Sequence, residues 1–174
     1  NYLTTSKNNK NIIIGILREP KDLKNKALIN KLEELSSVVL IKGWKINLST
    51  LEQYFKFIKN CDLLISCKDW SYPIQVSGII NDCISQNTIP VSSKDNYHFN
   101  YLIKRGLLKK EWQTENLLDY LKKENFKEIF EFSQKCSNWR NNCRIKNRET
   151  IKYIFNRYKK NLILIYQGNE NGGG

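Results

Sequence analysis

Short apolar runs alternate with amphipathic segments between residues 11 and 91, and this alternation limits the possible folds more than any other feature of the sequence. Residues 63–65 and 89–91 are apolar runs of the kind found in strands that are buried on both faces. Between them we expect a helix that begins at Pro73, where a missing N–H costs nothing, with four apolar side chains at helical spacing: Val76, Ile79, Ile80 and Cys83. Such a strand–helix–strand segment favours a right-handed βαβ unit with parallel strands.

Similar segments precede this unit. Residues 11–17 and 38–41 are apolar and β-branched, and a helical pattern of leucines lies between them from about Leu23 to Leu35. Residues 49–52 resemble a capping box in which Ser49 and Glu52 each accept the other's backbone N–H. The helix that follows has a predicted buried side of Leu51, Tyr54, Phe55 and Ile58. The whole order predicts the α/β class: a Rossmann-like parallel sheet with helices on both faces and a helical C-terminal extension.

The pattern becomes mainly helical after residue 91. Residues 97–108 fit either a short helix or a buried loop, and further helices are expected from Thr114, from a capping box at residues 125–128, and over about 149–160. Residues 162–165 fit either a final strand or a helix end. The predicted division is a linker or frayed end at 1–10, a Rossmann-like domain at 11–125, a helical extension at 126–167 and a disordered tail at 168–174. Because the chain has no Met, we expect it to be part of a longer protein.

The net charge of +12 and the pI near 9.5 have two explanations. One is a polyanionic partner, and the other is an AT-biased coding sequence, which enriches Lys, Asn and Ile without selection for binding. The five cysteines form no C-x-x-C pair and His98 is the single histidine, so we expect no metal site and no disulfide. With no signal peptide and no apolar run near the roughly 20 residues of a membrane span, the expected location is cytoplasmic.

Ligands of open α/β sheets bind beyond the carboxyl ends of the strands, and this rule selects the candidate residues. After the first strand, Gly15 allows close approach of the backbone, and Arg18, Lys21 and Lys24 are placed to meet a diphosphate near a helix start. A solvated loop in a Lys-rich chain explains the same residues. Neither a G-x-G-x-x-G fingerprint nor a P-loop is present.

Residues 66–72 and 92–98 follow the third and fourth strands. Trp70 and Tyr72 suit stacking on a sugar or a base, with Lys68 and Asp69 orienting the ligand, although an aromatic cover over the sheet edge is the alternative. Ser92 begins the second stretch.

Asp82 is the remaining candidate. It lies in the helix between the third and fourth strands, where a carboxylate either faces solvent or binds a hydroxyl such as that of a ribose diol.

In sequence order, these segments resemble glycosyltransferase family 4-like enzymes with the GT-B fold. Residues 82–91 (DCISQNTIPV) resemble the family's Glu-Ala-x-Ala-x-Gly-x-Pro-Val segment, with Asp82 at the second Glu and Asn87 or Thr88 at the Gly. Residues 15–18 with Lys21 or Lys24 are similar to its Gly-Arg-Leu…Lys-Gly stretch. Residues 51–54 and 60–66 are similar to its helix and its Asp-hydrophobic-Ser strand, and residues 102–108 to its Gly-Leu-Leu element.

The resemblance implies a carboxyl-terminal, donor-binding half whose N-terminal, acceptor-binding half is missing from this chain. It implies that Arg18 and a following Lys contact the donor diphosphate and that Asp82 contacts the ribose. The family's first Glu would fall at Ile74, where Asp69 is the nearest carboxylate, so Asp69 and Asp82 are the candidate catalytic residues. The donor would be a nucleotide-sugar and the acceptor a glycan or glycolipid, as in polysaccharide biosynthesis, with no metal or other cofactor required.

The basic segment of residues 139–148 supports two rival interpretations. One is a nucleic-acid-binding module without catalysis, which we disfavour because Trp139, Ile145, Ile151 and Phe155 fit packing positions and no RNA- or DNA-binding motif is present. The other is an electrostatic dock on an anionic membrane surface, which would make the protein peripheral to a membrane.

Overall fold

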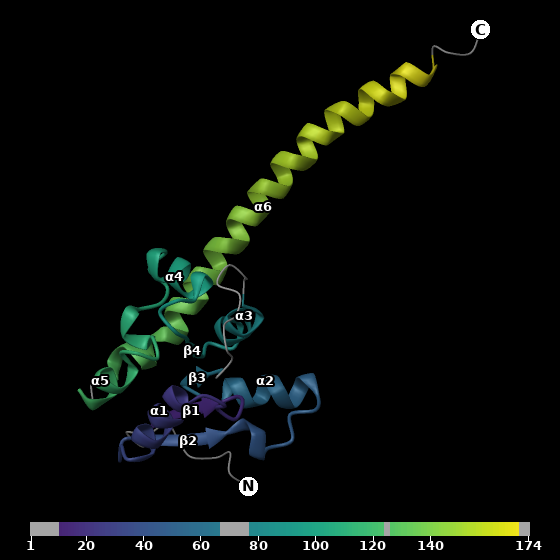
Figure 1. Ribbon diagram of the computed structural model, residues 1–174. Coiled ribbons are helices and arrows are strands. Elements are labelled where there is room, and N and C mark those ends of the chain that lie inside the picture. Colours follow the sequence, from purple (N-terminus) through teal and green to yellow (C-terminus); the bar gives the residue numbers. More distant parts are fainter. Residues whose placement is uncertain (1–10, 67–76, 124–125, 171–174) are drawn as a thin grey trace. The chain divides into compact units, whose positions relative to one another are not determined.

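Four parallel strands form one sheet in the order β2-β1-β3-β4 (Figure 1). The computed structural model describes residues 11–66, 77–123 and 126–170, with side chains described as far as residue 156. The strands are β1 (Ile12–Ile16), β2 (Val38–Lys42), β3 (Leu63–Ile65) and β4 (Ile89–Val91). Ile14 of β1 pairs with Leu40 of β2 on one side and with Leu63 of β3 on the other. The predicted parallel Rossmann-like sheet is therefore confirmed.

Helices follow the strands along the chain. They are α1 (Leu23–Glu33), α2 (Leu51–Lys59), α3 (Gly78–Ser85), α4 (Tyr97–Lys104), α5 (Leu117–Lys122) and α6 (Lys127–Glu170), with short 3-10 turns at Gly43–Lys45 and Lys110–Trp112. The region predicted as either a helix or a buried loop, residues 97–108, contains α4. Helix α4 ends in a Schellman motif at Gly106, whose φ of 75° suits glycine.

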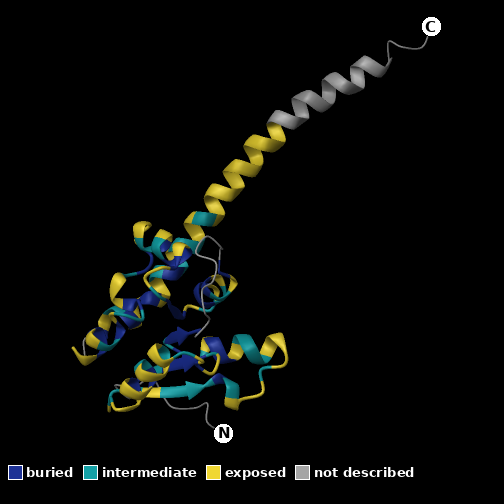
Figure 2. Cartoon of the chain, viewed as in Figure 1, coloured by how far each residue is buried: buried dark blue, intermediate teal, exposed yellow. Residues whose placement is uncertain are grey.

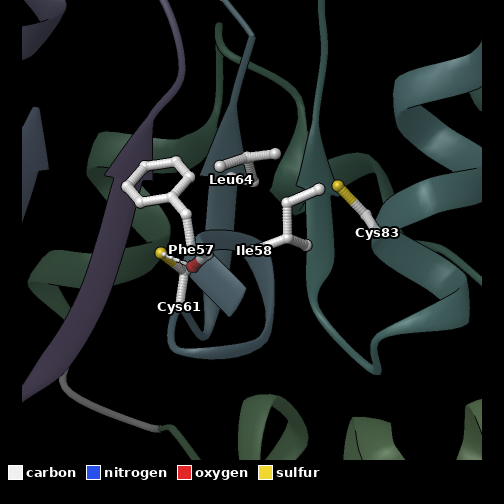
Figure 3. Packing of buried hydrophobic residues seen from close by; sticks show 5 residues of the cluster. All are labelled: Phe57, Ile58, Cys61, Leu64 and Cys83. Carbon is white, nitrogen blue, oxygen red and sulfur yellow. Dashed lines mark hydrogen bonds between the residues drawn. The ribbon is translucent and has the colours of Figure 1, made fainter. Parts of the chain in front are cut away.

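Successive side chains of a strand point to opposite faces of the sheet. Because consecutive residues of these strands are apolar, both faces of the sheet are apolar. Ile12, Ile14 and Ile16 of β1 are fully buried on one face. On the other face, Ile13 and Leu17 pack against a cluster formed by α2, β3 and α3: Phe57, Ile58, Cys61, Leu64 and Cys83. Figure 3 shows Ile58 between Phe57 and Cys83 in this cluster. This double burial accounts for the unbroken apolar runs in the sequence.

The predicted capping box is displaced by one residue. Thr50 is the N-cap of α2: its Oγ1 accepts from the Gln53 N–H at 3.2 Å, and the Gln53 Oε1 accepts from the Thr50 N–H at 3.2 Å. The predicted Ser49–Glu52 pair is therefore wrong. Leu51, expected on the buried side, is 75% exposed because it lies in the first turn, ahead of the residues that pack on β3.

The start of α3 also differs from the prediction. Helix α3 begins at Gly78, where the Ser77 Oγ accepts from the Ile80 N–H at 3.4 Å, so the predicted start at Pro73 is wrong. A side-chain cap can satisfy an orphan N–H that Pro would only remove. Pro73 and Val76 themselves lie outside the described residues.

The chain divides into two compact units, Asn1–Cys136 and Ser137–Gly174. The first unit extends past residue 125, the predicted end of the Rossmann-like domain, because the first turns of α6 bury Ile129, Phe132 and Cys136. The indole of Trp112 packs edge-on against Phe132, with ring centroids 5.4 Å apart. Residues 162–165 lie within α6, so the alternative of a final strand is wrong. Residues 149–160 also belong to this 44-residue helix rather than to a separate one.

Candidate functional site

The order in which the chain adds strands to the sheet reverses between β1 and β3. In the order β2-β1-β3-β4, the chain leaves β1 toward β2 and then returns to the opposite side of β1 to form β3. Such a switch point opens the crevice in which α/β proteins bind ligands. The Leu17 N–H donates to the Ile65 carbonyl at 2.9 Å and so holds the two strand ends together up to this edge.

Buried polar side chains gather at this carboxyl edge, beyond β3 and β4. Seven polar residues are buried in the described part of the chain, and only Thr88 of these precedes a strand. Of the other six, Ser66 and Ser92 follow β3 and β4, and Gln113 pairs with Ser92 in a β-bridge. Ser77 lies at the start of α3, and Asn96 and His98 lie at the start of α4. We call these six residues the polar edge cluster. Sequence analysis selected Ser92 and its stretch but missed Ser77 and Gln113, because nothing local marks them as neighbours.

A hydrogen bond from a backbone N–H to a side chain joins the starts of α3 and α4 within this cluster. The Ser77 N–H donates to the His98 Nδ1 at 3.2 Å, so the proton of the neutral imidazole is assigned to Nε2. Burial lowers the pKa of His98. The bond from the Ser77 N–H also favours the neutral ring, because only an unprotonated Nδ1 can accept it. The ring is therefore neutral at pH 7 and carries one N–H donor.

Two atoms of the polar edge cluster are buried without a hydrogen-bond partner among the described residues: the Ser92 Oγ and the Asn96 Nδ2. The other side-chain atom of Asn96, Oδ1, caps α4 by accepting from the Phe99 N–H at 2.9 Å. An unsatisfied buried polar atom costs about 1–3 kcal/mol, which makes such an atom in a folded domain a signal of a ligand or another partner. Both atoms can donate to an acceptor on a bound molecule.

The charges of Asp82 and Arg18 both affect the pKa of the Tyr54 hydroxyl. The Tyr54 hydroxyl donates to the Asp82 Oδ2 at 2.9 Å, which links the first turn of α2 to the middle of α3. Burial and the Asp82 carboxylate raise the pKa of Tyr54, and the nearby positive charge of Arg18 opposes that rise. Asp82 thus contacts Tyr54, which sequence analysis assigned only to packing, and the charge of Arg18 acts on the same phenol.

Gly15 is confined by packing. A Cβ on this residue would lie 2.5 Å from the Cys61 Sγ and 2.9 Å from the Leu64 Cδ1. The glycine therefore allows α2 and β3 to lie close to β1, and this close approach explains it without a ligand.

The predicted diphosphate cations have different surroundings. Lys24 forms an ion pair with Glu115 at 3.0 Å, whereas Arg18 and Lys21 are exposed. Burial raises the pKa of Glu115, but bonds from Lys24, Thr114 and the Lys94 N–H outweigh it and lower the pKa overall. Glu115 thus ties the start of α1 to the chain that follows β4 and competes with any phosphate for Lys24.

Four predicted site residues, Lys68, Asp69, Trp70 and Tyr72, lie outside the described residues. Within the described ranges, no group of three or more His, Cys, Asp or Glu side chains could hold a metal ion. In the same part of the chain, no helix combines the length and the apolar character needed to cross a membrane.

Comparison with known proteins gives no match: no family model, no curated protein and no solved structure is significantly similar to this chain.

Proposed function

We propose that this chain is the donor-binding part of a glycosyltransferase and binds a nucleotide-sugar at the carboxyl edge of its sheet. The observation that carries the proposal is the polar edge cluster, in which the Ser92 Oγ and the Asn96 Nδ2 are buried and unpartnered among the described residues. These neutral donors suit the hydroxyl and carbonyl acceptors of a sugar or a base. The fold supports the proposal because ligands of parallel α/β sheets bind at this edge.

Cations beside β1 supply the complementary part of the proposed site. Arg18 lies two residues after the end of β1 and Lys21 two residues before α1, so either can approach the donor diphosphate. During transfer, the bond between the sugar C1 and the diphosphate oxygen breaks, the acceptor hydroxyl oxygen bonds to C1, and the hydroxyl proton passes to the departing diphosphate. Negative charge then develops on the leaving diphosphate, and stabilising that charge is the role we assign to Arg18 and Lys21. The acceptor would be held by a further domain of the longer protein.

Asp82 is proposed to bind the ribose of the nucleotide. Its Oδ2 accepts from the Tyr54 hydroxyl, which holds the carboxylate in one orientation. We therefore treat Asp82 as a positioning carboxylate, while the proposed catalytic role of Asp69 lies outside the described residues.

Asn87 adds support from the resemblance to family 4-like glycosyltransferases. Asn87 is, with Thr88, one of the two residues that correspond to the family's glycine, and its φ is 64°, the left-handed conformation that glycine adopts most easily. It occupies the C′ position of a Schellman motif, since the Thr88 N–H donates to the Cys83 carbonyl at 2.9 Å and the Asn87 N–H to the Ile84 carbonyl at 3.3 Å. The loop before β4 thus has the backbone geometry that the family's glycine would provide.

Calorimetric titration with a panel of UDP-, GDP- and ADP-sugars tests the proposal. Arg18→Ala should weaken binding by roughly 10- to 100-fold, the range expected for loss of a hydrogen bond to a charged group. Lys31→Ala, which removes an exposed cation from the last turn of α1, is the matched control and should bind as the wild type does. Failure of the whole panel to bind, together with RNA binding that weakens steeply with salt, would favour a nucleic-acid-binding module instead.

Ser92→Ala gives a second test, because it should change the stability of the chain and its affinity for a nucleotide-sugar in opposite directions. Removing an unsatisfied buried hydroxyl should stabilise the ligand-free chain by up to about 1 kcal/mol, and the same change should weaken nucleotide-sugar binding. Asn96→Asp keeps the cap on α4 but removes the amide donor, so it should weaken binding without unfolding the helix. A destabilised Ser92→Ala variant with unchanged affinity would show that the hydroxyl serves the fold.

A further inference from the structure

The second unit is strongly basic along its helical part. Between residues 137 and 156 the chain has five Lys or Arg residues and one acidic residue, Glu149, a net charge of +4. Arg144, Lys146, Arg148 and Lys152 are all exposed in this stretch of α6 (Figure 2). The sequence continues in the same way with Arg157, Lys159 and Lys160.

Large apolar side chains are exposed on the same stretch. Ile151, Ile154 and Phe155 are 64%, 45% and 69% exposed, and their i, i+3, i+4 spacing places them on one side of the helix. Arg148 and Lys152 lie one turn apart, and helical geometry puts both at one border of this side. We call Ile151, Ile154 and Phe155 the apolar stripe of α6.

We propose that this part of α6 docks the protein on an anionic phospholipid surface, with the apolar stripe in the interface and the flanking cations against the headgroups. A helix with a strip of aliphatic and aromatic residues beside a Lys/Arg-rich face lies in the plane of a membrane interface, where it satisfies both faces at once. The proposal is independent of the nucleotide-sugar site.

Charge and chemistry favour a lipid surface over the other partners that such a helix can have. A second copy of this helix would bring two strongly positive segments together, and like charges at an interface oppose association. A nucleic acid would neutralise the cations but would give Ile151 and Ile154 no apolar partner. An anionic bilayer provides negative charge and an apolar layer within a few ångströms of each other.

Co-sedimentation of the full chain with vesicles tests the proposal. The chain should bind vesicles of phosphatidylcholine with roughly one-third phosphatidylserine at least about tenfold more tightly than vesicles of phosphatidylcholine alone. Arg148→Gln with Lys152→Gln should reduce binding to the anionic vesicles by about tenfold or more, because each cation near the surface contributes separately. Gln is a good helix former, so this variant should keep the helix.

A triple variant, Ile151→Ser, Ile154→Ser and Phe155→Ser, should lose most of the binding to anionic vesicles. The matched control is Tyr153→Ser: Tyr153 is 65% exposed but lies about 200° around the helix from Ile151 and Phe155, so its loss should leave binding unchanged. Equal binding by the triple variant and the wild type would overturn the proposal. So would an RNA oligomer binding where vesicles do not, or a wild-type dimer that the triple variant dissociates.

Discussion

Replacement of Gly15 by Ala separates a packing role from a ligand-binding role for this glycine. The added methyl would lie 2.5 Å from the Cys61 Sγ, 2.9 Å from the Leu64 Cδ1 and 3.1 Å from the Phe57 Cζ. All three atoms belong to a buried cluster that joins β1, α2 and β3. No Cβ is accommodated at such distances, so either β1 or these side chains must move.

The expected loss of stability follows from these contacts. Forcing a methyl into a packed core costs about 1–3 kcal/mol. Restricting the unfolded chain by replacing Gly returns about 0.4–1 kcal/mol. The net loss is therefore about 1–2 kcal/mol, and for a chain of this size it corresponds to a decrease in Tm of about 2–8 °C.

Denaturant unfolding of Gly15→Ala, Cys61→Ala and the double variant measures this effect. Cys61→Ala removes the atom nearest to the added methyl, so the double variant should be about 1 kcal/mol more stable than the sum of the single changes predicts. Gly78→Ala is the control, because a Cβ there has no neighbour within 4 Å among the described residues and Ala favours the helix. An unchanged stability of Gly15→Ala combined with loss of nucleotide-sugar binding would refute the packing explanation.

Changes at three further residues test the geometry by unfolding measurements. Thr88→Val should cost about 1–3 kcal/mol, because the Thr88 hydroxyl donates to the buried Ile58 and Cys61 carbonyls at 2.7 and 3.1 Å; a stability equal to that of the wild type would contradict this role. Asn87→Gly should be neutral or stabilising, whereas Asn87→Ala should cost about 1 kcal/mol because Ala avoids a φ of 64°; equal effects of the two changes would exclude a left-handed residue 87. Burial lowers the pKa of His98 in the folded chain, so on acidification the unfolded chain takes up the proton at a higher pH than the folded chain does. The free energy of unfolding should therefore fall as the pH drops below about 6.5 toward the pKa of the folded state. The slope of unfolding free energy against pH between about 7 and 5.5 should flatten in His98→Gln, since the chain has no other histidine, and an unchanged slope would contradict a buried, neutral ring.

The fold class followed from the sequence because its signals are local. Runs such as residues 63–65 are apolar wherever both faces of a strand are covered, and helical spacing shows within a few turns. The same locality explains the errors. Ser49 and Thr50 each begin an S/T-x-x-E/Q pattern, so the sequence alone does not choose between them, and the structure places the cap at Thr50.

The candidate site, in contrast, depends on contacts between distant residues. The bond from Ser77 to His98 spans 21 residues and the bond from Tyr54 to Asp82 spans 28. No periodicity or motif connects such pairs, because their proximity arises only when parallel strands bring the loops after them to one edge. By itself the sequence determined that this edge would exist and that Arg18, Asp82 and Ser92 would be near it. Only the tertiary structure decided that Gly15 serves packing, that Lys24 pairs with Glu115, and that two buried donors at the edge lack partners among the described residues.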